Sequence, residues 1–141
     1  MRFVIALLLA TPAQAWEFSA TPVCTILNDA PGLSIRVTYD LSRPEPYAIS
    51  LTRSDPWPVT DSFGLSFNGP AAMTIGTSRH QLSDDRRTLS VSDTGFGNVL
   101  DGLAFNGTAT ALAGDIAIPV DLTGARPAVE AFRACGVPPS A

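Results

Sequence analysis

The side chains best suited to catalysis fall within one short stretch, TSRHQLSDD at residues 77–85. It contains His80, the one histidine of the chain, together with Ser78 and the adjacent carboxylates of Asp84 and Asp85. A serine, a histidine and a carboxylate are the components of a hydrolytic triad. No nucleophile-elbow or oxyanion-hole sequence surrounds them, however. We therefore expect a surface histidine beside a turn, and the alternative is a small hydrolase that uses His80.

Cofactor chemistry has little support in the sequence. One histidine leaves carboxylates as the main metal ligands, and the Asp84–Asp85 pair lacks the spaced oxygen ligands and the glycine of a calcium loop. The chain contains neither a G-x-x-x-x-G-K-[ST] phosphate loop nor a dinucleotide-binding glycine fingerprint. We expect no metal, no cofactor and no enzymatic activity.

Four residues are candidates for contacting a ligand: Trp57, His80, Arg86 and Arg87. Two adjacent guanidinium groups can hold an anion through bidentate hydrogen bonds. The aspartates directly before Arg86 and Arg87 favour a solvated turn in which the charges compensate one another. Trp57 lies between two prolines in an irregular segment. Its indole is either an exposed anchor for a partner or a cover over the edge of the core, and the sequence leaves both open.

The first fifteen residues, MRFVIALLLATPAQA, have the order of a secretory signal. Arg2 precedes an apolar run from Phe3 to Ala10, and a small-x-small site closes the segment at Ala13–Ala15. A membrane-spanning helix needs about 20 apolar residues, so this run is too short to anchor the protein. We expect cleavage before Trp16, which leaves residues 16–141 as a single β-rich domain, periplasmic or secreted, without a stable membrane anchor.

Export determines the expected state of the two cysteines, Cys24 and Cys135. In an oxidising compartment two cysteines of a small domain usually pair. We predict a Cys24–Cys135 disulfide that ties the first strand to the last helix. Its role is structural, because the sequence has no Cys-x-x-Cys spacing typical of redox proteins.

Alternation of apolar and polar residues with a period of two dominates the chain after residue 16. In LSIRVTYD (33–40) the apolar side chains fall on one face of a strand and the polar ones on the other. The pattern recurs in VCTIL, YAISLTR, FGLSF, MTIGT and IAIPVDL. HQLSDDRRTLSVSD predicts two short strands about the Asp84–Asp85 turn. Pro119 places its strand at an edge or a bulge.

Two segments have helical spacing instead. Residues 96–104 predict a short helix, and GARPAVEAFRAC (124–135) predicts a C-terminal α-helix with Pro127 in its first turn. The chain is therefore mainly β. We expect an antiparallel β-sandwich or small barrel of about eight strands with a C-terminal α-helix and one short helix near 96–104.

The charge balance limits the classes of partner. The chain has a formal net charge of −4 and no lysine. An acidic protein without a basic cluster is poorly suited to binding nucleic acid or anionic lipid. An envelope protein or a small ligand remains as the expected partner, and the sequence does not indicate an oligomeric state.

Both ends of the chain resemble a known type of exported protein. The leader, the sequence WEF at 16–18, the early cysteine and the closing DLTGARPAVEAFRAC at 121–135 are similar to small alphaproteobacterial exported proteins of the invasion-associated locus B type. This resemblance implies a periplasmic β-sandwich. The chain lacks the further cysteines that many such proteins carry, and no residue role is transferred from that family.

Together these features predict a non-enzymatic exported domain that binds a protein or small ligand through its loops. The alternatives are the small hydrolase using His80 and a purely structural envelope component.

The leader and disulfide hypotheses share one test, intact mass under non-reducing conditions. We expect the protein isolated from its producing cell to begin at Trp16 and to be lighter than the dithiol form by two hydrogen atoms, because cleavage and oxidation both follow export. An uncut chain with two alkylatable thiols would contradict both hypotheses.

Overall fold

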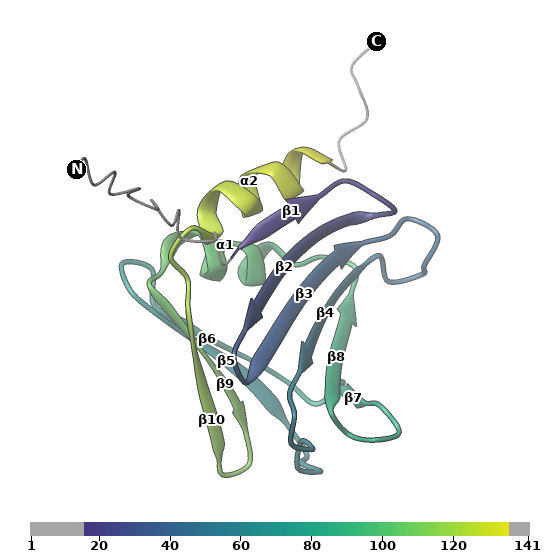
Figure 1. Cartoon of the computed structure of the whole chain (residues 1–141), viewed down its shortest axis with the longest axis vertical. Coiled ribbons are helices and arrows are strands. Elements are labelled where there is room, and N and C mark those ends of the chain that lie inside the picture. Colours follow the sequence, from purple (N-terminus) through teal and green to yellow (C-terminus); the bar gives the residue numbers. More distant parts are fainter. Residues whose placement is uncertain (1–15, 136–141) are drawn as a thin grey trace, which may run out of the picture.

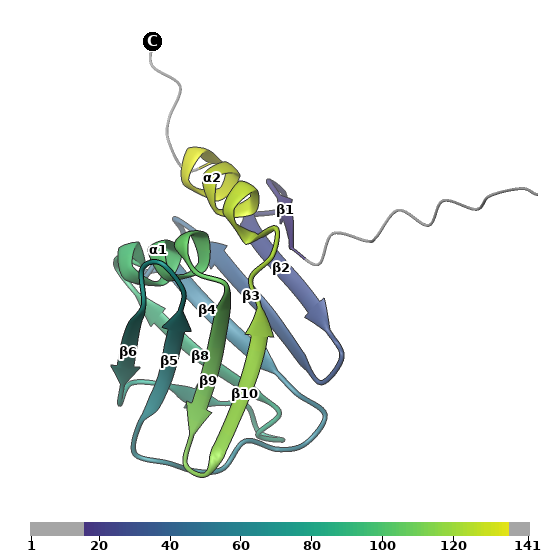
Figure 2. The same cartoon turned by 90° about the vertical axis from the view of Figure 1, so that its left-hand side faces the viewer.

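Two antiparallel β-sheets face each other, and two helices cover one end of the pair (Figures 1 and 2). The computed structural model describes residues 16–135, so the expected leader at 1–15 lies outside the described residues. The first sheet has the order β1 (Glu17–Ser19), β2 (Cys24–Ala30), β3 (Leu33–Tyr39), β4 (Tyr47–Thr52), β8 (Thr88–Asp93) and β7 (Gln81–Leu82). The second sheet has the order β10 (Ile116–Asp121), β9 (Thr108–Ala113), β5 (Phe63–Asn68) and β6 (Met73–Thr77). The helices are α1 (Gly97–Phe105) and α2 (Ala125–Cys135).

The predicted mainly β sandwich with a C-terminal helix is confirmed, and the two sheets do not close into a barrel. The short helix expected near 96–104 is α1. The strands number ten among the described residues rather than about eight. The strand β1, which lies before β2, was not predicted. It has only three residues, and a segment of this length cannot show a period-two pattern.

Alternation along the strands builds the core. On the inner face of the first sheet the register places Ile26, Val37, Ile49 and Val91 in one row across β2, β3, β4 and β8. Ile26 and Val37 are fully buried, and Ile49 is 3% exposed. Val91 at the end of the row is only half-buried. Along this row the burial therefore decreases toward Val91, whereas Leu89, the other inward apolar residue of β8, is fully buried against Leu51.

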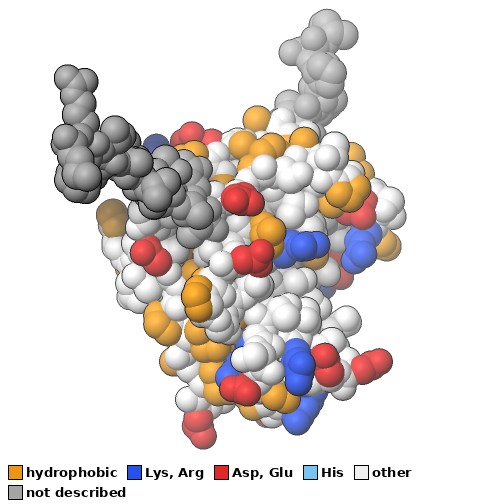
Figure 3. Space-filling view, viewed as in Figure 1, with side chains coloured by type: hydrophobic (Ala, Val, Ile, Leu, Met, Phe, Trp, Pro, Cys, Tyr) orange, Lys and Arg blue, Asp and Glu red, His pale blue; other side chains and the backbone are white. Residues whose placement is uncertain are grey.

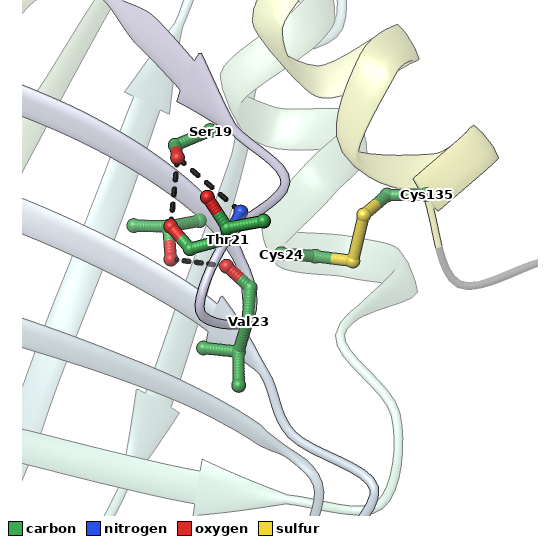
Figure 4. Close-up of a disulfide and its surroundings, with 6 residues drawn as sticks. Ser19, Thr21, Val23, Cys24 and Cys135 are labelled. Carbon is green, nitrogen blue, oxygen red and sulfur yellow. Dashed lines mark hydrogen bonds between the residues drawn. A yellow bond between two sulfur atoms is a disulfide. The ribbon is translucent and has the colours of Figure 1, made fainter.

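The helices close one end of the sandwich. α2 buries Ala125, Ala128, Val129 and Phe132 along one face, as its amphipathic spacing predicts. The disulfide between Cys24 at the start of β2 and Cys135 at the end of α2 is formed, as predicted (Figure 4). It closes a separation of 111 residues in the sequence. In the chain-entropy model a loop of this length contributes about 4.7 kcal/mol to stability.

Neither helix is a candidate membrane span. Within residues 16–135 no helix combines the length and the apolar character needed to cross a membrane.

α1 lies so close to the second sheet that one of its positions accepts only glycine. A Cβ atom built on Gly102 would stand 2.5 Å from the ring of Phe67, which is itself 1% exposed and has no room to move away. A Cβ atom on Gly97, at the start of the same helix, meets nothing within 4 Å. Alanine substitutions at Gly102 and Gly97 therefore form a matched pair of variants, because only the first introduces a close contact.

We expect Gly102→Ala to lower the free energy of unfolding by about 1–3 kcal/mol through overpacking, despite the better helix propensity of alanine. Gly97→Ala should leave that free energy unchanged or raise it by up to about 1 kcal/mol. Urea denaturation followed by tryptophan fluorescence measures both values. Equal stabilities for the two variants would contradict the close packing of α1 on Phe67.

Candidate functional site

The end of the sandwich opposite the helices is closed by the segment that joins β4 to β5, in which Trp57 is fully buried. Its indole Nε1 donates a hydrogen bond to the carbonyl oxygen of Leu51 at 3.0 Å. The ring of Phe63 meets it edge-on with centroids 6.1 Å apart, and the Arg53 guanidinium lies over it at 5.2 Å. Of the two roles that the sequence left open, the cover over the core is confirmed. The exposed-anchor interpretation of Trp57 is wrong, because a fully buried indole has no surface to offer a partner.

The β1–β10 edge is bridged in a similar way by the other tryptophan. Trp16 is 2% exposed, and its Nε1 donates a hydrogen bond to the Asp121 carbonyl oxygen at 2.9 Å. Because Trp16 precedes β1 and Asp121 ends β10, this contact joins the two sheets near their helical end. Below it, Ile116 and Ile118 of β10 are half-buried.

The opposite edge of the sandwich, between β6 and β8, contains a cavity of about 370 Å³. Both strands lie on the left side of the molecule in Figure 2. Ile49 and Leu65, from the middle of the two sheets, line its inner part, and Ile75 and Val91 line its outer part. We call this cavity the edge cleft. Residues of both sheets line it, whereas the hollow beside Trp16 is lined by β1, α2 and their flanking residues.

The second sheet thins toward the edge cleft in the same way as the first. Ala111, Leu65 and Ile75 form one inward row across β9, β5 and β6. Ala111 is 1% exposed and Leu65 is 6% exposed, but Ile75 on β6 is only half-buried. Apolar side chains that alternation directs to the core thus stay accessible to a ligand from both walls of the cleft.

The mouth of the edge cleft is formed by backbone rather than by large side chains. Gly95 and Gly97 line it, and a Cβ atom on either would meet nothing within 4 Å. The first turn of α1, which also lines the mouth, has no side-chain cap. Its backbone N–H groups, unlike those of the following turns, have no partner within the helix and are free to donate to a ligand or to water.

Asp93 is the charged residue among those that line the edge cleft. It ends β8, opposite Tyr47 of β4, and it is half-buried. Its Oδ1 accepts hydrogen bonds from the backbone N–H of Thr94 at 2.6 Å and from the Thr94 hydroxyl at 3.3 Å. Within residues 16–135 the Asp93 carboxylate forms no ion pair with an arginine.

The residues of the triad hypothesis are not brought together. His80 lines a polar hollow with Glu45 and Ser90, and its buried Nδ1 has no hydrogen-bond partner among residues 16–135. Asp85 is instead engaged in its own turn, where it accepts from the Ser83 hydroxyl at 2.7 Å and from the backbone N–H of Arg87 at 3.0 Å. Ser78 is exposed. The combination of His80 with Ser78 and Asp85 therefore gains no geometric support, and the small-hydrolase alternative that uses His80 stays a prediction.

The arginines that the sequence singled out lie in the same turn. Arg86 and Arg87 are both exposed, and the Arg86 carbonyl oxygen accepts a hydrogen bond from the backbone N–H of Trp57 at 2.7 Å. Arg86 has a φ of 59°, a left-handed conformation that non-glycine residues adopt mainly in turns. These contacts give the turn a structural role, and anion binding by the two side chains stays a prediction.

Three carboxyl groups have a lowered pKa, and all three stabilise turns. The pKa of Asp40 is lowered chiefly by the Ser42 hydroxyl, that of Asp121 by the Thr123 hydroxyl and that of Asp85 by the backbone N–H of Arg87. Each donor lies two residues after its aspartate, which is the arrangement of an Asx turn. None of these groups lines the edge cleft, so their shifts do not indicate catalysis there.

Metal binding also gains no support from the described part of the chain, where no group of three or more histidine, cysteine, aspartate or glutamate side chains could hold an ion. On the face shown in Figure 3, acidic and basic side chains are interspersed rather than gathered by sign.

The edge cleft was not predicted from the sequence. Alternation along MTIGT and TLSVSD places Ile75 and Val91 on the inner faces of their strands, but it does not say that β6 and the end of β8, which β7 leaves unpaired, lie at the same edge. Comparison of the chain with protein-family models, with curated proteins and with solved structures finds no match in any of the three. The edge cleft therefore has to be interpreted from its own geometry.

Proposed function

We propose that this protein is a non-catalytic, exported binding module that holds a small, largely apolar molecule in the edge cleft. The observation that carries the proposal is the exposure of Ile75 and Val91, which face inward from opposite walls yet remain only half-buried. Burying such surface against a ligand is favourable by about 25 cal/mol for each Å² of apolar area. The proposed contact surface is thus the gap between the sheets rather than the loops.

The size and lining of the cleft favour a small molecule. Its volume of about 370 Å³ lies toward the lower end of the range for small-molecule sites, roughly 300–1,000 Å³. Such sites combine apolar walls with a few polar groups that orient the ligand. Here Phe63 and Phe96 add to the apolar walls, whereas Thr77, Asp93 and Asn98 supply the polar groups.

The same lining favours binding over catalysis. Among the described residues that line the cleft there is no serine, cysteine or histidine, Thr77 carries the one hydroxyl, and Asp93 is the one carboxylate. Nucleophilic catalysis needs an activated nucleophile with a base beside it, and general acid–base catalysis by carboxylates commonly uses a pair. The cleft offers neither combination.

The proposed compartment rests on the leader-like residues 1–15 and on the disulfide, which is compatible with an exported protein. Kinship with the locus B type of periplasmic protein belongs to the same proposal and rests on the sequence at the two ends of the chain.

Filling the edge cleft with a bulky side chain should weaken binding. We expect the neutral fluorescent probe N-phenyl-1-naphthylamine to bind the wild-type protein saturably, and Ile75→Trp to weaken that binding roughly tenfold or more, about 1.4 kcal/mol. Thr74→Trp is the matched control, because Thr74 is exposed on the outer face of the same strand. Probe fluorescence gives the dissociation constants, and circular dichroism checks the fold of each variant.

Val91→Phe, which fills the cleft from the opposite wall, serves if Ile75→Trp does not fold. Undiminished probe binding in a folded cleft-filling variant would exclude the edge cleft as the site.

A further inference from the structure

The geometry of the edge cleft points to a ligand of one charge type: we propose that it selects small amines, with a cationic head at Asp93 and an apolar body between the sheets. This inference rests on the proposed function and adds the chemical class of the ligand. It follows from two features of the lining, a single unpaired carboxylate and aromatic rings around it.

The carboxylate is placed to receive a cation. Asp93 lines the cleft from the end of β8, and the hydrogen bonds from Thr94 converge on its Oδ1. Its Oδ2 is left to accept from a ligand. Some half-buried acidic groups have arginine partners, as Glu45 has Arg79 and Asp101 has Arg133, whereas several exposed ones, such as Asp61 and Asp115, have none among the described residues. Asp93 has no such partner within residues 16–135, so an ammonium group would supply the missing charge.

Aromatic rings beside Asp93 favour the same charge. Phe96 lines the cleft, and its ring centroid is 5.6 Å from that of Tyr47, the residue directly opposite Asp93 in the β4–β8 ladder. Phe63 lines the cleft as well. The faces of such rings attract cations, especially where water is partly excluded. Phe63 and Phe96 are 3% and 5% exposed, so the Asp93 carboxylate is the main feature that favours an ammonium group over an anion, and the rings add to it.

The amino-terminal end of α1 is the one opposing feature. Its first turn lines the mouth and carries a partial positive charge of about half an elementary charge, spread over its free N–H groups. The full negative charge of Asp93 exceeds this partial charge. The protein is also acidic as a whole, with a formal net charge of −4, which raises the local concentration of cations and lowers that of anions.

The inference is tested with three six-carbon ligands: n-hexylamine and n-hexanol, which differ only in head group, and hexanoate, which carries the opposite charge. Each displaces N-phenyl-1-naphthylamine from the wild-type protein at pH 7, where the amine is cationic. We expect n-hexylamine to bind about fivefold more tightly than n-hexanol, and hexanoate to bind most weakly. In Asp93→Asn the preference for the amine should disappear while the affinity for n-hexanol stays within twofold.

Asp115→Asn is the matched control. It removes the same charge from the exposed turn between β9 and β10, away from the cleft, and should leave the amine preference intact. Salt gives an independent measurement on the wild-type protein alone. Raising NaCl from 20 to 500 mM should weaken binding of n-hexylamine but not of n-hexanol.

The outcomes separate this inference from the proposed function. Binding of the neutral probe without any preference for the amine, or with a preference that Asp93→Asn retains, overturns the inference and leaves the proposed function standing. Saturable binding of none of the four compounds overturns both. A preference that depends on Asp93 and on salt supports both.

Discussion

The structure depends on one constraint: the inner faces of two facing sheets must be covered at both ends and along both edges. The chain meets this requirement with large side chains and helices rather than with more strands. α1 and α2 cover one end, Trp57 covers the other, and Trp16 bridges the β1–β10 edge through its hydrogen bond to Asp121. Along the β6–β8 edge the cover is incomplete, and half-buried side chains of both inner faces line the edge cleft there.

Because the two ends and the β1–β10 edge of the sandwich are held closed, the β6–β8 edge can stay open. The Cys24–Cys135 disulfide joins the helical cover directly to β2, so that cover does not separate without unfolding. Fully buried rows such as Ile26 and Val37 hold the sheets together away from the cleft. A binding site formed by residues of a stabilised framework needs little reorganisation when a ligand enters, which favours affinity. The core and the cleft are thus two parts of the same inner surface of the sheets. The side chains are fully buried in the core and only partly buried in the outer part of the cleft.

Local physics made much of the fold predictable from the sequence. Period-two alternation located the long strands, and helical spacing with Pro127 located α2. The leader-like sequence at 1–15 led to the prediction of the disulfide, because export would place the cysteines in an oxidising compartment. The burial of Trp57 and the existence of the edge cleft could not be predicted from local patterns. Whether Trp57 is buried depends on Leu51 and Phe63 being brought beneath it, and the cleft requires β6 and β8 to share an edge. Strand order is a long-range property, and neither periodicity nor turn chemistry encodes it.

The central claim is that the gap between the sheets at β6 and β8 is the binding surface. Two-dimensional NMR of the ¹⁵N-labelled protein during titration with n-hexylamine tests it most directly. Our account predicts saturable amide shifts confined to the lining of the cleft, which is β6, the end of β8, residues 94–99 and the neighbourhood of Ile49 and of Phe63–Leu65, with the turns at Gly32 and Gly114 unaffected. Saturable shifts that cluster instead around Trp16 and α2, or around the Arg86–Arg87 turn, would contradict it.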